Sequence, residues 1–118
     1  METKDIGEPN LWVPMKDPVL LAALGKLGEE ANELGAILFR TIIQGGLDQT
    51  NPDTGELNID AIEKEVADVA ALSQLVTDMI GLNRNRMISR SEKKRQMKMK
   101  WLQMLSRLEH GELHAPAT

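Results

Sequence analysis

Two long segments of this chain place aliphatic residues at steps of three, four and seven, the period of an α-helix with one apolar face. The first stripe comprises Leu20, Leu24, Leu27, Leu34, Leu38 and Ile42, and the second comprises Ile62, Val66, Val69, Leu72, Val76, Met79 and Ile80. The 118 residues include two Trp, one Phe and no Tyr, so aliphatic side chains and seven Met must fill the core. This pattern predicts an all-α protein and argues against a β-sandwich.

Local capping signals set the ends of these helices. Asp17 followed by Pro18 is a good start for a helix over 18–44, and Gly45 with Gly46 is a good stop. Residues 45–59 form a long connection around the turn sequence at 51–55, and we expect a short hairpin there between Leu47 and Leu57. A second helix over 60–81 begins at Asp60, which resembles a capping box with Glu63.

The remaining parts of the chain are less regular. Residues 1–16 are predicted to be an irregular arm whose apolar residues, Leu11 to Met15, lie against the body. A third, basic helix is predicted over 85–109, and residues 112–118 are predicted to be a frayed tail. Glycines 25, 28 and 35 lie inside the first helix, where they lower helix propensity and allow close packing against a neighbour.

Size and composition limit the class of protein. A chain of 118 residues makes one small domain, and three helices have a modest core of their own. We therefore expect the bundle to be completed by oligomerisation through four-helix packing, as a homodimer or homotetramer. Without cysteine there are no disulfides and no thiolate metal sites, and the apolar runs are too short for a membrane span. The N-terminal sequence has no apolar signal core, so we expect a cytoplasmic protein.

Charge is distributed unevenly along the chain. Residues 1–82 hold 15 acidic and 5 basic residues, whereas residues 83–118 hold 9 basic and 3 acidic residues. The basic segment could be a solvated face, a partner for the acidic body, a phosphate-binding helix or a nucleic-acid tail. The acidic body makes nucleic acid the least favoured of these, and a solvated or paired face the most favoured.

Carboxylates occur where the helices should be apolar. Glu65 falls inside the stripe of the second helix, with Asp68 at its edge, while Glu30 lies on the shoulder of the first stripe and Glu33 one step further round. An unpaired charge on a core-facing stripe is costly, so something must neutralise these groups. Lys26, Arg40 and Lys64 are the basic residues within the two helices, and Lys64 points away. The other solution is a hard divalent cation, because Mg²⁺ and Mn²⁺ prefer oxygen ligands. An acid pair at i and i+3 is by itself commonly a solvated face, so the pattern leaves both interpretations open.

Two short motifs add a family resemblance. Residues 29–33 read EEANE, of the form EExxE, and residues 65–68 read EVAD, of the form ExxD. The surrounding strings KLGEEANELG and IEKEVADVAALSQLV resemble the MazG-like family of the all-α nucleoside triphosphate pyrophosphatases, over about residues 18–82. The 31 residues between Glu33 and Glu65 exceed the spacing usual in that family, which leaves the subgroup and the role of the 45–59 connection open.

The resemblance implies a magnesium-dependent enzyme that cleaves an NTP or dNTP between the α and β phosphates, giving a monophosphate and pyrophosphate. By position in the motifs, the metal ligands would be Glu30, Glu33, Glu65 and Asp68. Glu29 and Glu33 are the candidates for orienting water or accepting its proton. Such proteins are helical and assemble as dimers or tetramers.

Positive side chains should stabilise charge on the leaving pyrophosphate. Lys26, one turn before Glu30, and Lys94 and Lys98 on the third helix are the candidates for binding the substrate. Trp12 and Trp101 are the only large aromatic residues able to stack on a base, and each is more typical of a core or an interface. The alternative to an enzyme is a non-catalytic helical module of this type that binds nucleotide or a protein partner.

Overall fold

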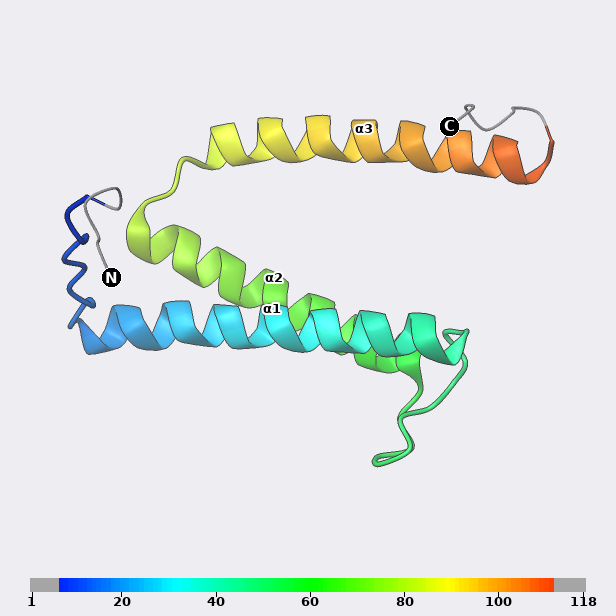
Figure 1. The fold of residues 1–118 in the computed structure, drawn as a ribbon, viewed down its shortest axis with the longest axis horizontal. Helices are drawn as coiled ribbons and strands as arrows, with labels where there is room; N and C mark the ends of the chain where they lie inside the picture. The colour runs from blue at the N-terminus through cyan, green and yellow to red at the C-terminus, as the bar shows by residue number, and fades with distance from the viewer. Residues whose placement is uncertain (1–6, 112–118) are drawn as a thin grey trace. The chain divides into compact units, whose positions relative to one another are not determined.

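The computed structural model describes residues 7–111. Within this range the chain forms three helices and no strand: α1 (Pro18–Gln44), α2 (Asn58–Ile80) and α3 (Arg84–Glu109) (Figure 1). The predicted all-α class is therefore confirmed. None of the helices in the described range has the apolar stretch that a membrane span requires. Residues 1–6 of the predicted arm and the predicted tail at 112–118 lie outside the described residues.

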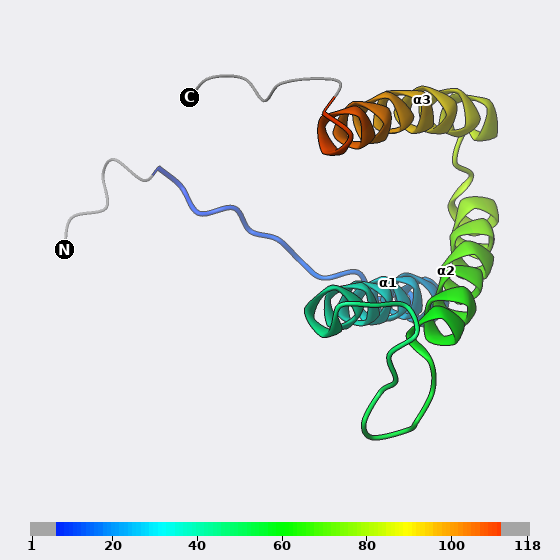
Figure 2. The same cartoon turned by 90° about the vertical axis from the view of Figure 1, so that its right-hand side faces the viewer.

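The helices fall into two compact units. The first ends at Met79 and contains α1 and α2, and the second begins at Ile80 and contains α3. In the first unit α1 and α2 run antiparallel and lie side by side, with the connection extending from one end of the pair (Figures 1 and 2).

Local sequence chemistry accounts for both ends of α1. The side chain of Asp17 caps the helix by accepting hydrogen bonds from the backbone N–H groups of Val19 (3.0 Å) and Leu20 (3.3 Å). At the other end Gly45 adopts a left-handed conformation with φ 81°, and its N–H donates to the carbonyl oxygens of Thr41 and Ile42. A residue with a Cβ is strained at that φ, so glycine ends the helix here.

The start of α2 differs from the prediction. The helix begins at Asn58, two residues before Asp60, and Asp60 lies within the first turn. Asn58 is fully buried, and its amide nitrogen donates to Gln44 Oε1 (2.7 Å) and the carbonyl oxygen of Gly46 (3.1 Å). Its amide oxygen accepts from Arg40 Nε (3.3 Å). These partners lie at the end of α1, so contacts distant in sequence, and not a local capping box, fix the start of α2.

The connection between α1 and α2 is tied at its base and turns tightly at its tip. The backbone N–H groups of Asn58 and Ile59 donate to the carbonyl oxygens of Gln49 (2.9 Å) and Leu47 (3.1 Å). One isolated antiparallel bridge joins Thr50 and Leu57, so the expected hairpin is reduced to a single bridge. Beyond it the chain turns through residues 51–55, where Gly55 has φ 76°.

The interior of the α1–α2 pair is small and unusually polar. Its buried apolar residues are Ala23, Ala61 and Val76, while Glu30, Asn58, Glu65 and Thr77 are buried and polar or charged. Large apolar side chains at the end of α1 remain exposed, among them Phe39 at 66% and Ile42 at 73%. A Cβ added at Gly25, Gly28 or Gly35 would meet no atom within 4 Å, so these glycines face open space in the single chain. The close packing expected of them does not occur within the described residues.

The described part of the N-terminal arm does not follow the expectation that it lies against the body. Leu11, Trp12 and Val13 are 75–85% exposed. Asn10 and Trp12 share a backbone hydrogen bond of 3.0 Å, but that contact is local to the arm. The chain's own helices therefore do not bury these apolar residues.

Candidate metal centre

Three carboxylates from α1 and α2 converge in the middle of the pair. Glu30, Glu33 and Glu65 each offer an oxygen, and these oxygens all lie within 4.8 Å of one another. Glu30 and Glu33 are one turn apart on α1, and Glu65 faces them from α2. Two of the three, Glu30 and Glu65, are buried at 8% and 7% exposure, and Glu33 is exposed at the edge of the group. We call Glu30, Glu33 and Glu65 the carboxylate group.

Glu65 is the residue of the carboxylate group that lacks a hydrogen-bond partner for one of its oxygens. Its Oε1 atom is buried and has no hydrogen-bond partner. A buried polar oxygen without a partner is costly, since burial removes its water and nothing replaces it. The stripe position of Glu65 on α2 follows from the sequence, and the structure adds that this side chain is directed at other acids.

The three acids perturb one another. The Glu30 carboxylate, which accepts a hydrogen bond from the protonated Glu65, raises the pKa of Glu65 to about 7, and burial and the charge of Glu30 add to the effect. The same hydrogen bond, together with Lys26, lowers the pKa of Glu30. Without a cation, Glu65 therefore keeps its proton up to about pH 7, where it is hydrogen-bonded to Glu30.

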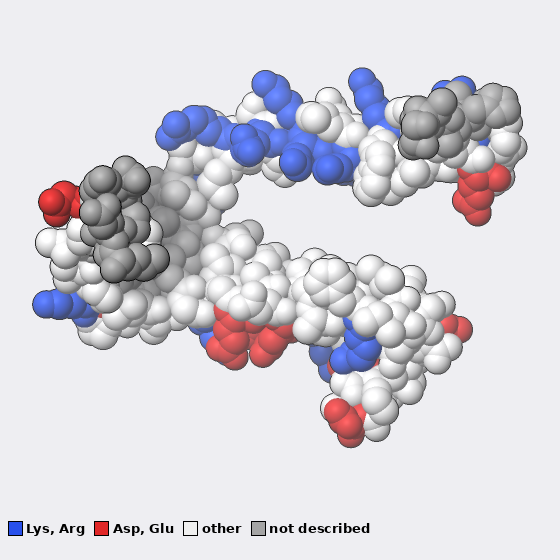
Figure 3. Space-filling model, in the orientation of Figure 1, with Lys and Arg blue, Asp and Glu red and all other residues white. Residues whose placement is uncertain are grey.

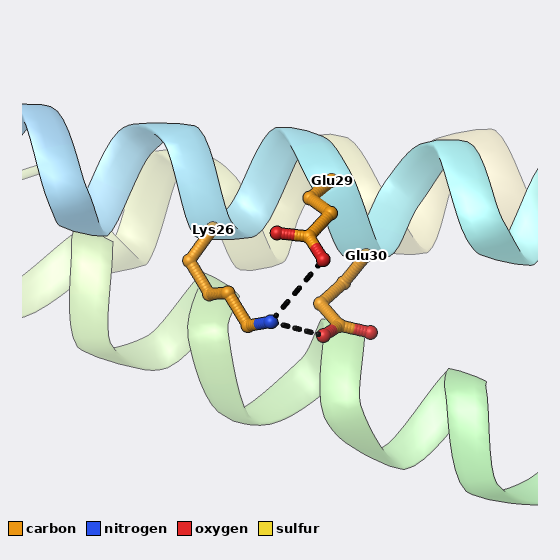
Figure 4. Close-up of polar contacts among 3 residues, drawn as sticks. All are labelled: Lys26, Glu29 and Glu30. Carbon is orange, nitrogen blue, oxygen red and sulfur yellow. Dashed lines mark hydrogen bonds and ion pairs between the residues drawn. The ribbon is translucent and has the colours of Figure 1, made fainter.

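Lys26 supplies the nearest positive charge. Its Nζ lies 3.2 Å from a Glu30 oxygen and 3.4 Å from a Glu29 oxygen, between the two carboxylates (Figure 4). Glu30 raises the pKa of Lys26 most strongly, and Glu29 adds to the effect, so Lys26 stays protonated. Lys26 partly neutralises the carboxylate group from its exposed side, but its two ion pairs are with Glu29 and Glu30 and not with Glu65.

Some of the predicted site residues lie together in the structure, and others lie elsewhere. The carboxylate group brings together Glu30, Glu33 and Glu65, and Lys26 and Glu29 border it. Asp68 is exposed on α2 and is not a member of the group as described. Lys94 and Lys98 belong to the second unit.

The donor set suits a hard divalent cation. Three carboxylate oxygens, one of them buried and unpartnered, are ligands of the type that Mg²⁺ and Mn²⁺ prefer. A cation there would replace the proton of Glu65 and provide the missing partner of Oε1. The residues present therefore fit such an ion.

No family model matches the chain, and neither a curated protein nor a solved structure was found that resembles it. The likeness to the MazG-like family consequently depends on the two motifs and their helical setting. Over residues 7–111 the structure shows three helices and a carboxylate group able to hold a metal ion.

Proposed function

We propose that this protein is a divalent-metal-dependent hydrolase that cleaves a nucleoside triphosphate, NTP or dNTP, between the α and β phosphates to give a monophosphate and pyrophosphate. The observation that carries the proposal is the carboxylate group, in which Glu65 is buried against two other acids with one oxygen unpartnered. The choice of this reaction depends on the motifs at 29–33 and 65–68, because they resemble those of pyrophosphatases of this type.

Within this proposal the buried acids hold the metal. Glu30 and Glu65 are its ligands, and Glu33 and, by its motif position, Asp68 would complete the set. Magnesium, or manganese in its place, would supply charge neutralisation of the phosphates and acidify a bound water. The raised pKa of Glu65, about 7, supports its proposed role as a ligand that would exchange a proton for a cation.

The exposed acids of the first motif are available for proton transfer. Glu33 is at the solvent-facing edge of the carboxylate group, where an attacking water would enter. Glu29 is about half exposed and is oriented by Lys26. Either carboxylate is proposed to accept the proton of the water that attacks the α-phosphorus, which is the role of a general base.

Lys26 is the proposed phosphate contact on the first unit. It is held beside the carboxylate group by two ion pairs yet remains about half exposed. A triphosphate approaching this surface would meet a cation that is already in position. Such a cation would stabilise the negative charge that develops on the leaving pyrophosphate. Lys94 and Lys98 stay predictions for the same role.

Self-association is part of the same proposal. The exposed apolar side chains at the end of α1 and the open glycine positions along it suit packing against a second copy, as a homodimer or homotetramer.

A hydrolysis panel tests the proposal. The protein is incubated with Mg²⁺ and each standard NTP and dNTP, and products are identified by chromatography or mass. We expect a monophosphate and pyrophosphate, with activity abolished by EDTA and by Glu65→Gln. Glu63→Gln is the matched control, since Glu63 is exposed on the same helix and outside the carboxylate group. Turnover that survives Glu65→Gln would falsify the assignment of this group as the active site.

One observation favours the non-catalytic alternative. Lys26 pairs with Glu30, and Glu65 shares a proton with Glu30, so the carboxylate group has an internal means of reducing its charge. A helical module that binds nucleotide without cleaving it is the corresponding function. Metal or nucleotide binding by well-folded protein, with no turnover across the panel, would establish it.

A further inference from the structure

Helix α3 is exposed along its whole length in the single chain. None of its residues is buried, and only Leu108 is partly covered. The helix carries nine Lys and Arg residues and two Glu residues, and basic side chains line it in the space-filling view (Figure 3). An unburied charged helix of 26 residues needs a partner to hold its conformation, because most helix stability comes from contacts outside the helix.

Four of the basic residues share one face of α3. At about 100° per residue, Arg86, Arg90, Lys93 and Lys94 fall within an arc of about 100°. A groove on this face is lined by Arg86, Ser89, Arg90, Lys93, Lys94 and Met97. These four cations therefore form a row along one face, with the other five basic residues of α3 on either side of it, and we call Arg86, Arg90, Lys93 and Lys94 the cation row.

Within the second unit the cation row has no anionic partner. None of its four side chains makes an ion pair with a described residue of that unit, whereas Lys26 and Lys64 in the first unit are both paired with glutamates. Four unpaired cations in line complement a polyanion with repeated charges. A single triphosphate would engage only part of such a row.

An aromatic side chain continues the same face. Trp101 follows Lys94 by seven residues, about 10 Å along the helix, and falls within the arc of the cation row. It is 54% exposed, and Lys98 Nζ lies 5.4 Å from its ring centroid. An exposed indole at the end of a row of cations is the combination by which proteins hold an unpaired base together with its backbone.

We propose that α3 is a binding surface for single-stranded nucleic acid. The cation row binds successive backbone phosphates, and Trp101 stacks on a base. This site is separate from the proposed hydrolase function, which concerns a mononucleotide at the carboxylate group. Lys94 belongs to the cation row and is also one of the residues predicted from the sequence to bind the substrate.

Two other occupants are less well matched to α3. A lipid surface requires one apolar face along the helix, but Ile88, Met99 and Leu102 lie on the side opposite Met97 and Trp101. An acidic protein surface would neutralise the cation row, but it would not account for the exposed ring of Trp101 on the same face. Both are tested below.

Fluorescence anisotropy measures the binding directly. A labelled oligonucleotide of about 20 nucleotides, as DNA and as RNA, is titrated with full-length protein in EDTA, which removes metal-dependent hydrolysis from the measurement. We expect micromolar binding at 50 mM salt, weaker binding to the matching duplex, and a slope of log K against log salt of about −3, since each single-strand phosphate contact contributes about −0.7.

Matched variants separate the cation row from overall charge. Arg90→Gln with Lys93→Gln should reduce affinity at least tenfold and make the slope less steep by about 1.4. The control, Lys16→Gln with Arg95→Gln, removes the same charge outside the row and should change affinity less than threefold. Trp101→Leu should weaken binding about tenfold with the slope unchanged, because it removes stacking alone. Circular dichroism checks that each variant stays helical.

Several results would overturn the inference. One is the absence of binding at 50 mM salt, and another is an equal loss of affinity in the two double variants. A third is binding to the duplex that is as tight as binding to the single strand and is unchanged by Trp101→Leu. Competition by polyglutamate as effective as unlabelled oligonucleotide would identify an acidic protein as the partner instead. Equally tight binding to vesicles of anionic lipid would identify a membrane surface.

Discussion

The α1–α2 pair and α3 use charge in opposite ways. In the pair two acidic side chains, Glu30 and Glu65, are buried, and Glu65 has an oxygen without a partner. On α3 nine of the eleven charged residues are basic, and every one is exposed. A charge that is buried at a cost indicates a bound ligand, whereas a row of exposed charges indicates a surface awaiting a large partner. Substitutions in each region test this contrast.

The first prediction concerns metal affinity. Glu30→Gln should weaken Mn²⁺ binding more than about 100-fold, because residues that merely orient a ligand already contribute 10–100-fold. Isothermal titration calorimetry at pH 8 measures the loss, with Glu63→Gln as the control expected to bind as the wild type does. Equal affinity in the wild type and Glu30→Gln would mean that the inward acids do not hold an ion.

The second prediction concerns assembly. Phe39 and Ile42 are exposed at the end of α1 and should be covered by a second copy. Light scattering should give at least a dimer for the wild type at micromolar concentration and a monomer for Phe39→Lys with Ile42→Lys. Val19→Lys, at the other end of α1 and also 66% exposed, is the control and should leave the mass unchanged. A wild-type monomer contradicts the expectation.

The third prediction concerns the buried amide at the start of α2. Asn58→Ala removes three side-chain hydrogen bonds, to Arg40, Gln44 and Gly46, and should lower the free energy of unfolding by about 3 kcal/mol. Urea denaturation followed by circular dichroism gives the value. Asn32→Ala, at an exposed position of α1, should change it by less than about 0.5 kcal/mol. Similar small effects in both variants would show that the amide does not fix the junction.

The fourth prediction is a dependence of stability on pH in the metal-free protein. The folded chain holds the Glu65 proton more tightly than the unfolded chain, with a pKa of about 7 against an ordinary 4.5. Its stabilising contribution is complete below pH 4.5 and is lost as the pH rises through 7. Glu65→Gln keeps a donor at every pH.

Thermal melting in EDTA measures this difference. The Tm of Glu65→Gln should match that of the wild type near pH 4.5 and exceed it at pH 8. Adding Mg²⁺ at pH 8 should then raise the Tm of the wild type alone, because ligands that bind the folded state stabilise it. A constant Tm difference between the two proteins from pH 4.5 to 8 would refute the shared proton.

Sequence patterns predicted the parts of this protein that depend on neighbouring residues. The Asp17 cap and the Gly45 stop of α1 are local, and the helical period placed Glu30 and Glu65 on the faces that meet. The start of α2 was placed two residues late because Asn58 is held by residues 12–18 positions earlier, which no local rule includes. The exposure of Trp12 could not be foreseen either, since an apolar residue in an arm is buried only if a surface is available to it.

The candidate site shows the same division. Periodicity identified the acids, yet it does not reveal which of them converge, since Asp68 occupies the edge of the stripe and stays exposed. Lys26 was expected to contact phosphate because it lies one turn before Glu30. The structure adds that its Nζ is already occupied by Glu29 and Glu30, a consequence of i, i+3 and i, i+4 spacing.

Because of the buried Asn58, the position of the carboxylates does not depend on the length of the connection. Its bonds to Gln44 and Gly46, with the backbone bond to Gln49, fasten the two ends of the loop together below its tip. Residues 51–55 can therefore be shortened, lengthened or exchanged while α2 keeps its register on α1. The loop tip is thus a place where this fold can acquire new recognition elements during evolution without disturbing the chemistry in the middle of its helices.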